Sequence, residues 1–168
     1  MKETERFYLK EYDEKYIEKY HSNFFSEKET AKYTLWRPTN NKFDAKDKLE
    51  YWINEVKVSV LWLVHQKSDD EPVGFISVDE IEENVYGNLG IAIGTKYLKR
   101  GYASEVLKTL IEYIKDNGGK AIHYSHFKEN EASKNLALKF GFKYYKMDKR
   151  IRRYDNKEFD ELFYILNL

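Results

Sequence analysis

The sequence contains no cysteine, only two prolines and eight glycines. Without cysteine, the chain has no disulfide framework, no thiolate zinc site and no thiol nucleophile. Its most apolar stretch, residues 58–64, is far shorter than the roughly 20 residues that a membrane-spanning helix needs. Neither charge dominates, because 29 lysines and arginines balance 29 aspartates and glutamates. That balance argues against a general binder of polyanions such as nucleic acids.

What the chain does contain is typical of a folded domain. Hydrophobic residues make up 42% and aromatic residues 17% of its 168 positions, which excludes a disordered chain. The length suits one domain that can bury a core without a metal or a disulfide. The charged opening segment lacks the apolar centre of a signal peptide. We therefore expect a single domain over residues 1–168, located in the cytoplasm.

Hydrophobic periodicity predicts a mixture of helices and strands. The clearest helix is 102–116, whose apolar residues recur at three- and four-residue spacing. A capping pair, Ser26 and Glu29, indicates a helix start within the mostly helical segment 12–33. The polar stretch 37–48 is typical of a loop, although Asp44 or Asp47 could cap a helix reaching about residue 56. A further helix is expected at 131–140, and strands at 5–10, 58–65, 73–80, 89–93, 121–127, 142–147 and 159–167. This order favours a mixed sheet in an α+β or α/β domain over a doubly wound parallel sheet.

The turn before helix 102–116 combines Lys99, Arg100 and Gly101. The start of a helix leaves about four backbone N–H groups unpaired and carries roughly half a positive charge. Such a turn is suited to bind phosphate. The simpler interpretation is that Gly101 only adopts a backbone angle that other residues avoid.

Two motifs resemble those of the GCN5-related N-acetyltransferases. Residues 97–103 read Tyr-Leu-Lys-Arg-Gly-Tyr-Ala, which is similar to the family pattern Gln/Arg-x-x-Gly-x-Gly/Ala. Residues 130–133 read Asn-Glu-Ala-Ser and are followed by Lys-Phe-Gly-Phe at 139–142, which resembles the second family motif. The opening Glu-Arg-Phe-Tyr-Leu-Lys at 5–10 is similar to the branch of ribosomal-protein and spermidine acetyltransferases.

This resemblance implies a sheet of about seven strands, mixed but mostly antiparallel, with about four helices. Its fourth and fifth strands, near 89–94 and 121–127, would splay apart in a V that holds acetyl-CoA. No metal is implied, and no residues have the spacing of metal ligands. The resemblance implies that pantetheine pairs with the backbone of the fourth strand at Ile91, Ala92 and Ile93. It implies that pyrophosphate binds in the turn at Lys99, Arg100, Gly101, Tyr102, Ala103 and Ser104. The second motif would add contacts from Asn130 and Ser133.

Several positions depart from the family pattern. Leu98 replaces the Gln or Arg that opens the first motif, and Lys99 stands where glycine is frequent. Ala137 stands where many members carry the tyrosine that protonates the leaving thiolate. In the branch that this chain resembles, the motif serine can take that role, which indicates Ser133. The alternatives are that Ser133 only caps or lines the helix near Asn130, or that Tyr144 or Tyr145 substitutes.

The base that would deprotonate an amine is not fixed by the sequence. Asn88 occupies the position where related sequences often carry glutamate. An amine with a pKa near 10 arrives protonated at neutral pH, so a group must remove that proton. Candidates are His126 near the end of its strand, Asp79 and Glu80, Glu29, the other histidines, or an ordered water chain. The alternative for His126 is a purely structural role.

The acceptor would enter from the opposite end of the V, along residues 24–43. Glu29, Tyr33 and Trp36 lie there, and a cationic amine favours carboxylates and aromatic faces. The alternative is that Tyr33 and Trp36 fill the core. The basic run 146–153 could face RNA or an acidic partner, or could be a solvated hairpin.

The leading hypothesis is an acetyl-CoA-dependent N-acetyltransferase. The acetyl group would pass directly to a primary amine of a protein N-terminus, a polyamine or another small molecule, since no cysteine is present to carry it. A strand amide near Ile91 to Ile93 would stabilise the oxyanion. The alternative is a non-catalytic module that binds coenzyme A, RNA or protein. A membrane partner is not expected, nucleic acid is disfavoured, and a homodimer is left open.

Overall fold

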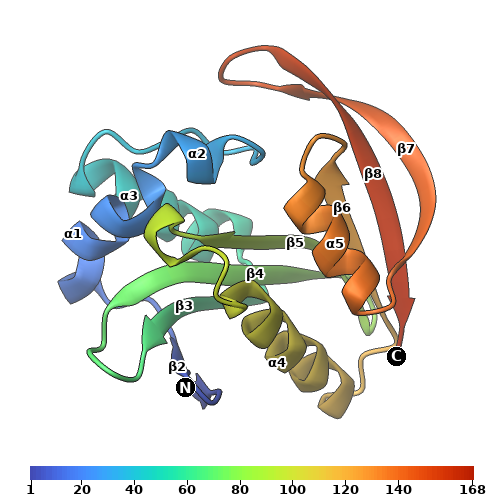
Figure 1. Cartoon of the computed structure of the whole chain (residues 1–168), viewed down its shortest axis with the longest axis horizontal. Coiled ribbons are helices and arrows are strands. Elements are labelled where there is room, and N and C mark those ends of the chain that lie inside the picture. Colours follow the sequence, from blue (N-terminus) through green and yellow to red (C-terminus); the bar gives the residue numbers. More distant parts are fainter.

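The computed structural model describes all 168 residues as one mixed sheet with helices on both faces (Figure 1). The sheet has eight strands in the order β1-β2-β3-β4-β5-β6-β8-β7. Every neighbouring pair is antiparallel except β5 and β6. The strands are β1 (Lys2–Glu3), β2 (Phe7–Lys10), β3 (Val60–Gln66), β4 (Pro72–Glu82), β5 (Val85–Ile93), β6 (Ala121–Phe127), β7 (Lys143–Arg152) and β8 (Lys157–Asn167).

Two groups of helices cover the sheet, and each has its own apolar core. One core packs α4 and α5 against β2 to β6, and the other packs α1, α3 and η2 against Leu63, Phe75 and Ala92. The helices are α1 (Ile17–Tyr20), α2 (Lys28–Ala31), α3 (Lys42–Tyr51), α4 (Tyr102–Asp116) and α5 (Glu131–Lys139), with short helical turns η1 (Glu14–Tyr16), η2 (His21–Phe25), η3 (Trp52–Val56) and η4 (Thr95–Tyr97). None of them is long and apolar enough to span a bilayer.

This architecture confirms the mixed α+β sheet expected from the sequence. The sheet has eight strands rather than about seven, because the two-residue strand β1 pairs with β2 at the edge. There are five α-helices rather than about four.

Two predicted helix starts are wrong. Ser26 has helical dihedral angles at the end of η2, so it cannot cap α2, and Glu27 takes the capping position instead. Helix α3 begins at Lys42, where the side-chain oxygen of Asn41 accepts a hydrogen bond from the amide of Asp44. The loop therefore ends before residue 42, and neither Asp44 nor Asp47 is the cap.

The sheet splits between β5 and β6. These parallel strands pair only at Val85 with Ala121 and at Tyr86 with Ile122. Beyond that point β5 continues to Ile93 bonded only to β4, while β6 pairs with β8 along its whole length. The two strands diverge from a vertex at Tyr86, which confirms the V-shaped opening.

The β7–β8 hairpin arches away from the sheet, and its tip returns toward α2 (Figure 1). Arg152 near this tip is only 5% exposed. Its Nη1 donates to the carbonyls of Lys32 at 2.8 Å and Thr34 at 3.2 Å, and its Nη2 pairs with Asp155 at 2.7 Å. The hairpin is thereby fastened to the segment that follows α2.

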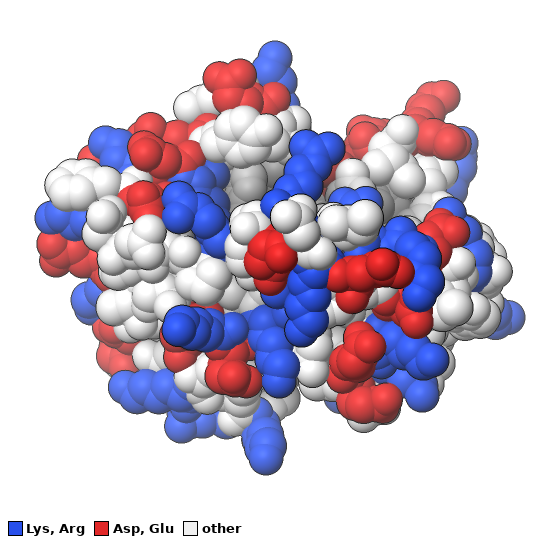
Figure 2. Space-filling view, turned by 90° about the horizontal axis from the view of Figure 1, so that it is seen from above, with Lys and Arg blue, Asp and Glu red and all other residues white.

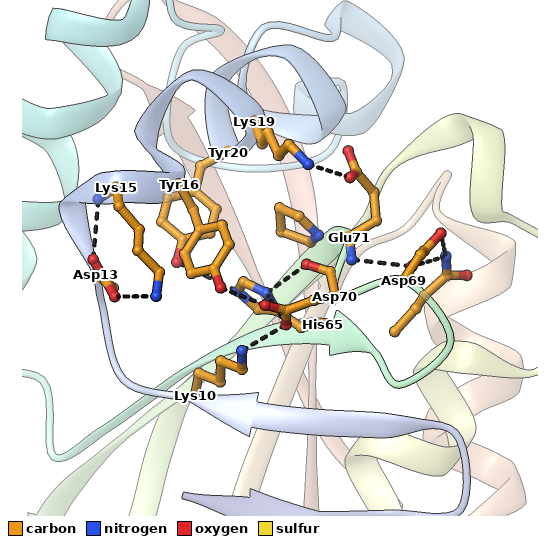
Figure 3. Close-up of polar contacts among 12 residues, drawn as sticks. Lys10, Asp13, Lys15, Tyr16, Lys19, Tyr20, His65, Asp69, Asp70 and Glu71 are labelled. Atoms are coloured by element: carbon orange, nitrogen blue, oxygen red, sulfur yellow. Dashed lines mark hydrogen bonds and ion pairs between the residues drawn. The ribbon is translucent and has the colours of Figure 1, made fainter.

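A polar cluster joins β2 and η1 to the turn between β3 and β4 (Figure 3). His65 is fully buried, and its Nδ1 lies 3.1 Å from the carbonyl oxygen of Asp70. The Asp70 carboxylate accepts hydrogen bonds from Lys10 and from the hydroxyl of Tyr16. Burial alone would raise the pKa of Asp70, but these two donors outweigh it and lower that pKa to about 2. The cluster therefore holds the N-terminal helices against the sheet edge.

Charges of both signs intermingle on the surface (Figure 2). Within the basic run 146–153, Lys146 pairs with Asp148 at 2.9 Å and Lys149 with Asp160 at 2.8 Å. With the Arg152–Asp155 pair, three of the five basic side chains in that run have acidic partners within the hairpin. The hairpin is therefore not the uniformly basic surface that RNA binding would favour.

Candidate active site

The turn before α4 presents a row of free backbone donors. Lys99 (φ +60°) and Gly101 (φ +76°) are both left-handed, with Arg100 between them. The amides of residues 99–104 donate to no protein atom. Amides gathered by a left-handed turn at a helix start form an anion-binding concavity. Such a concavity fits the pyrophosphate of a coenzyme A molecule.

Arg6, in the connection between β1 and β2, contacts this turn and the first turn of α4. Arg6 Nη1 donates to the carbonyl of Arg100 at 2.8 Å, and Arg6 Nε pairs with Glu105 at 2.6 Å. Burial would raise the pKa of Glu105, but hydrogen bonds from Thr4 and Arg6 hold it below its usual range. Arg6 lies in the opening motif, but the sequence did not indicate that it contacts a turn 94 residues away.

Strand β5 exposes its backbone edge to the V. The amide of Gly94 bonds to the carbonyl of Val73 beside β4. Because successive amides along a strand point to opposite edges, those of Ile91 and Ile93 face the opening, whereas that of Ala92 faces β4. Two of the three residues expected to contact pantetheine thus offer free amides to the V.

On the opposite side of the opening, α5 begins with a cap that involves both residues of the second motif. The Asn130 side chain accepts from the amide of Ser133 at 3.1 Å. The Ser133 hydroxyl lies 2.6 Å from the hydroxyl of Tyr124 on β6. Burial raises the pKa of Tyr124 to about 12, and the contact with Ser133 only partly opposes that rise. The Tyr124 hydroxyl therefore stays protonated beside Ser133. The sequence motifs did not indicate Tyr124.

His126 lies on β6 but has no free ring nitrogen. Its Nδ1 is 2.8 Å from the carbonyl of Phe127, which can only accept, so Nδ1 carries the hydrogen. Its Nε2 then accepts from the hydroxyl of Tyr164 at 2.9 Å. His126 is 5% exposed and stacks on the Tyr164 ring. This geometry favours the structural alternative over a proton-accepting role.

Trp36, which the sequence suggested as an acceptor contact, lies against a lysine of α3. Lys48 Nζ lies 4.9 Å from the centre of the Trp36 ring and 5.8 Å from that of Trp52. Burial, reinforced by repulsion from Arg37, lowers the pKa of Lys48 to about 8. Trp36 is half-buried and also packs on Phe25 and Phe75. Its aromatic face is thus already in contact with a lysine and is not free to bind an external amine.

The other two expected acceptor residues lie around α2. Glu29 is exposed on α2, and its side chain makes no polar contact with the protein. Tyr33 is half-buried, with Lys32 Nζ 5.3 Å from its ring centre. Neither packs in the aromatic cluster of Trp36, although Arg152 fixes the backbone on both sides of Tyr33.

One further basic side chain joins the two helices that flank the opening. Lys139 Nζ on α5 lies 3.0 Å from the Ser104 hydroxyl in the first turn of α4. Its charge therefore stands next to the free amides of the turn, where it can attract a phosphate. Lys139 belongs to the second sequence motif, but only the fold shows this proximity.

The split sheet, its open edge and the donor-rich turn define a class of protein that binds an extended, phosphate-bearing ligand. Residues 6–143 match the family described as acetyltransferase (GNAT) domain. The chain therefore belongs to the GNAT acetyltransferase family. No curated protein matches the sequence significantly.

Solved structures share the fold along nearly the whole chain. A GNAT-family acetyltransferase from Bacillus anthracis is 22% identical, with 98% of this chain and 96% of that chain covered and a TM-score of 0.83. The microcin C7 self-immunity acetyltransferase MccE, solved with acetyl-CoA and AMP, is 19% identical at 98% and 93% coverage and a TM-score of 0.84. RimL, a ribosomal L7/L12 alpha-N-protein acetyltransferase solved with coenzyme A, is 16% identical at 98% and 96% coverage and a TM-score of 0.81.

Proposed function

We propose that this protein transfers an acetyl group from acetyl-CoA directly to a primary amine. The observation that supports this most strongly is the free amides of residues 99–104 next to the open edge of β5. Both MccE and RimL, which share the fold, were solved with acetyl-CoA or coenzyme A. One domain, residues 1–168, would carry the whole reaction.

The residues around the V can supply each part of acetyl transfer. Acetyl-CoA supplies an acetyl group activated as a thioester. The amides of Ile91 and Ile93 can donate to the carbonyl oxygen as it gains negative charge. The turn amides and Lys139 can hold the phosphates, with Asn130 fixing the start of α5.

Ser133 is well placed to protonate the leaving sulfur. Tyr124 keeps its proton and can donate it to the Ser133 oxygen, which leaves the Ser133 hydrogen free to point into the V. Tyr124 can then replace the proton that Ser133 gives up. In this proposal Ser133 and Tyr124 together protonate the leaving thiolate, which Ala137 cannot do because its side chain is not polar.

We infer the class of amine from the printed name of one relative and from the position of the β7–β8 hairpin next to α2. RimL is named as an alpha-N-protein acetyltransferase, which supports a protein N-terminus as acceptor. Arg152 holds the hairpin tip next to the segment after α2, so the hairpin borders the side where we place a peptide N-terminus or a polyamine. We place acceptor contacts along residues 24–43, including Glu29 and Tyr33.

The test is release of free thiol from acetyl-CoA with a panel of polyamines, aminoglycosides, amino acids and peptides with free N-termini. The proposal expects release with at least one amine and none without amine. A thermal shift with acetyl-CoA, measured in parallel, separates binding from chemistry. Binding without thiol release from any amine would indicate a non-catalytic module.

A further inference from the structure

A carboxylate stands at the vertex of the V with one oxygen unused. Asp79 lies on β4 directly opposite Gly87 of β5, next to the last paired residues of β5 and β6. Its Oδ2 accepts from Asn88 Nδ2 at 3.2 Å. Its Oδ1 is buried and has no hydrogen-bond partner. A buried carboxylate oxygen without a donor is costly, so this position favours an incoming N–H group.

The bulge in β5 positions that carboxylate. The register between β4 and β5 slips between Ser77 and Asp79, and Asn88 takes up the extra residue with φ +50°. Asparagine tolerates this left-handed conformation better than most residues. Its amide holds one oxygen of Asp79 without adding a charge, which leaves the other oxygen available.

Asp79 lies on the face of the sheet that carries α1 to α3. Along β4, Phe75, Ser77 and Asp79 alternate onto this face, and Phe75 belongs to the core beneath those helices. A Cβ built on Gly87 would lie 3.6 Å from Cβ of His123 on β6. The Ile81 side chain packs over Gly87, with its Cδ1 2.9 Å from the same Cβ position, so an apolar side chain covers the strand pair next to Asp79.

No internal cation neutralises this carboxylate. No lysine or arginine lies within ion-pair distance of Asp79. The groups that face it are the neutral Asn88 on β5 and, across Gly87, His123 on β6, whose Nδ1 is held 2.9 Å from the hydroxyl of Tyr145 on β7. The other base candidate on β4, Glu80, is exposed and accepts from the amide of Asn84 at 2.7 Å.

We propose that Asp79 binds the acceptor ammonium through Oδ1 and removes its proton, directly or through one water. This inference rests on the proposed acetyl transfer. It places proton removal on β4 in a chain whose β5 carries Asn88, which cannot accept a proton. An ammonium held against a carboxylate away from water loses its proton more readily, because burial disfavours both charges.

The proton and electron balance of the step is complete. Asp79 takes one proton from the ammonium and later releases it to solvent. The freed electron pair on nitrogen forms the C–N bond, and the C–S bond breaks with its pair on sulfur. Nitrogen loses a second proton to water, sulfur takes one from Ser133, and Ser133 regains one from solvent through Tyr124. One proton is released in each turnover.

The experiment compares Asp79→Asn with wild type, using the panel amine that gives the fastest thiol release. Asp79→Asn should lower kcat by about a hundredfold at pH 7. The acetyl-CoA thermal shift should not change. Wild-type kcat/KM should be flat across neutral pH. The variant depends on amine that arrives unprotonated, so its kcat/KM should rise about tenfold per pH unit. Asp79→Glu should recover part of the rate.

Two further variants keep the test decisive. Glu82→Gln, the same change at the exposed end of β4, should retain wild-type kinetics. Asn88→Asp would put a second carboxylate against Asp79, which hinders ionisation of both and should move the acidic limb of kcat/KM to higher pH.

If Asp79→Asn does not fold, an acidic limb of kcat/KM that stays at the wild-type pH in Asn88→Asp overturns the proposal. Wild-type kinetics in a folded Asp79→Asn also overturns it but leaves acetyl transfer intact. No thiol release by the wild type would instead overturn the proposed function itself.

Discussion

At the scale of single residues, the phosphate turn depends on two left-handed positions. Gly101 adopts φ +76° without strain, whereas Lys99 adopts φ +60° despite its Cβ. A Cβ on Gly101 would meet nothing closer than Arg6 Nη2 at 3.6 Å. A larger residue at position 101 therefore has enough room, and only the backbone conformation would oppose it.

Gly101→Ala should weaken the binding of coenzyme A. The left-handed conformation costs an alanine roughly 1 kcal/mol, which corresponds to about a fivefold loss of affinity if the turn relaxes away from it. Lys99→Gly is the matched control, because glycine adopts the same angle freely, and it should bind at least as well as wild type. Isothermal titration with coenzyme A measures both. Equal affinity of Gly101→Ala and wild type for coenzyme A would show that binding does not depend on the left-handed turn geometry.

At the scale of elements, the long β7–β8 hairpin pairs with β6 through β8, and Arg152 adds a separate contact near its tip. Most of β7 is exposed, and Arg152 is its only buried residue. The three carbonyls that it contacts belong to the last residue of the short helix α2, Ala31, and to Lys32 and Thr34 just after it. Arg152 therefore links the hairpin to the wall where we place the acceptor.

Arg152→Ala should destabilise the protein by about 2 kcal/mol, since it removes charge-assisted hydrogen bonds from buried carbonyls and from Asp155. It should also raise KM for the amine and leave acetyl-CoA binding unchanged. Arg153→Ala, an exposed change one residue away, serves as the control. Urea denaturation and steady-state kinetics measure the two effects. A stable variant with wild-type KM would contradict an anchoring role.

At the scale of the whole molecule, sequence patterns predicted what depends on near neighbours. Periodicity and short motifs indicated the amphipathic helix α4 and the phosphate turn, and the family resemblance implied the split strands. The caps of α2 and α3 were predicted wrongly, because Ser26 ends the π-helical turn η2 with helical dihedral angles, and Asn41 rather than either aspartate caps α3. Arg6 and Arg152 act on backbone 94 and 120 residues away, and such contacts leave no local pattern. The same holds for the pairing of Asp79 with Asn88 across a bulge.

The whole molecule should lose stability as the pH falls. Burial lowers the pKa of His65 in the folded state, so the unfolded chain binds the proton more readily, and stability falls once the pH drops below about 6.5. Asp70 has a folded pKa of about 2, so its contribution is present above about pH 4 and is lost as the pH approaches 2.

Asp70→Asn should flatten the dependence of stability on pH below 4, while it leaves the slope near pH 6 in place. Asparagine also tolerates the left-handed angle at this position. Urea denaturation between pH 7 and pH 3 measures the slope. An equally steep fall below pH 4 in the variant would show that the ionisation of Asp70 does not stabilise the folded state.

Direct acetyl transfer to an amine is tested by the stoichiometry of its products. The protein is incubated with isotopically labelled acetyl-CoA and the most reactive panel amine, and mass spectrometry counts the labelled acetyl groups on the amine and on the protein. Direct transfer should give one acetylated amine for each coenzyme A released, with no acetyl-protein intermediate. Release of coenzyme A without an acetylated amine, or transfer by way of a labelled protein residue, would contradict it.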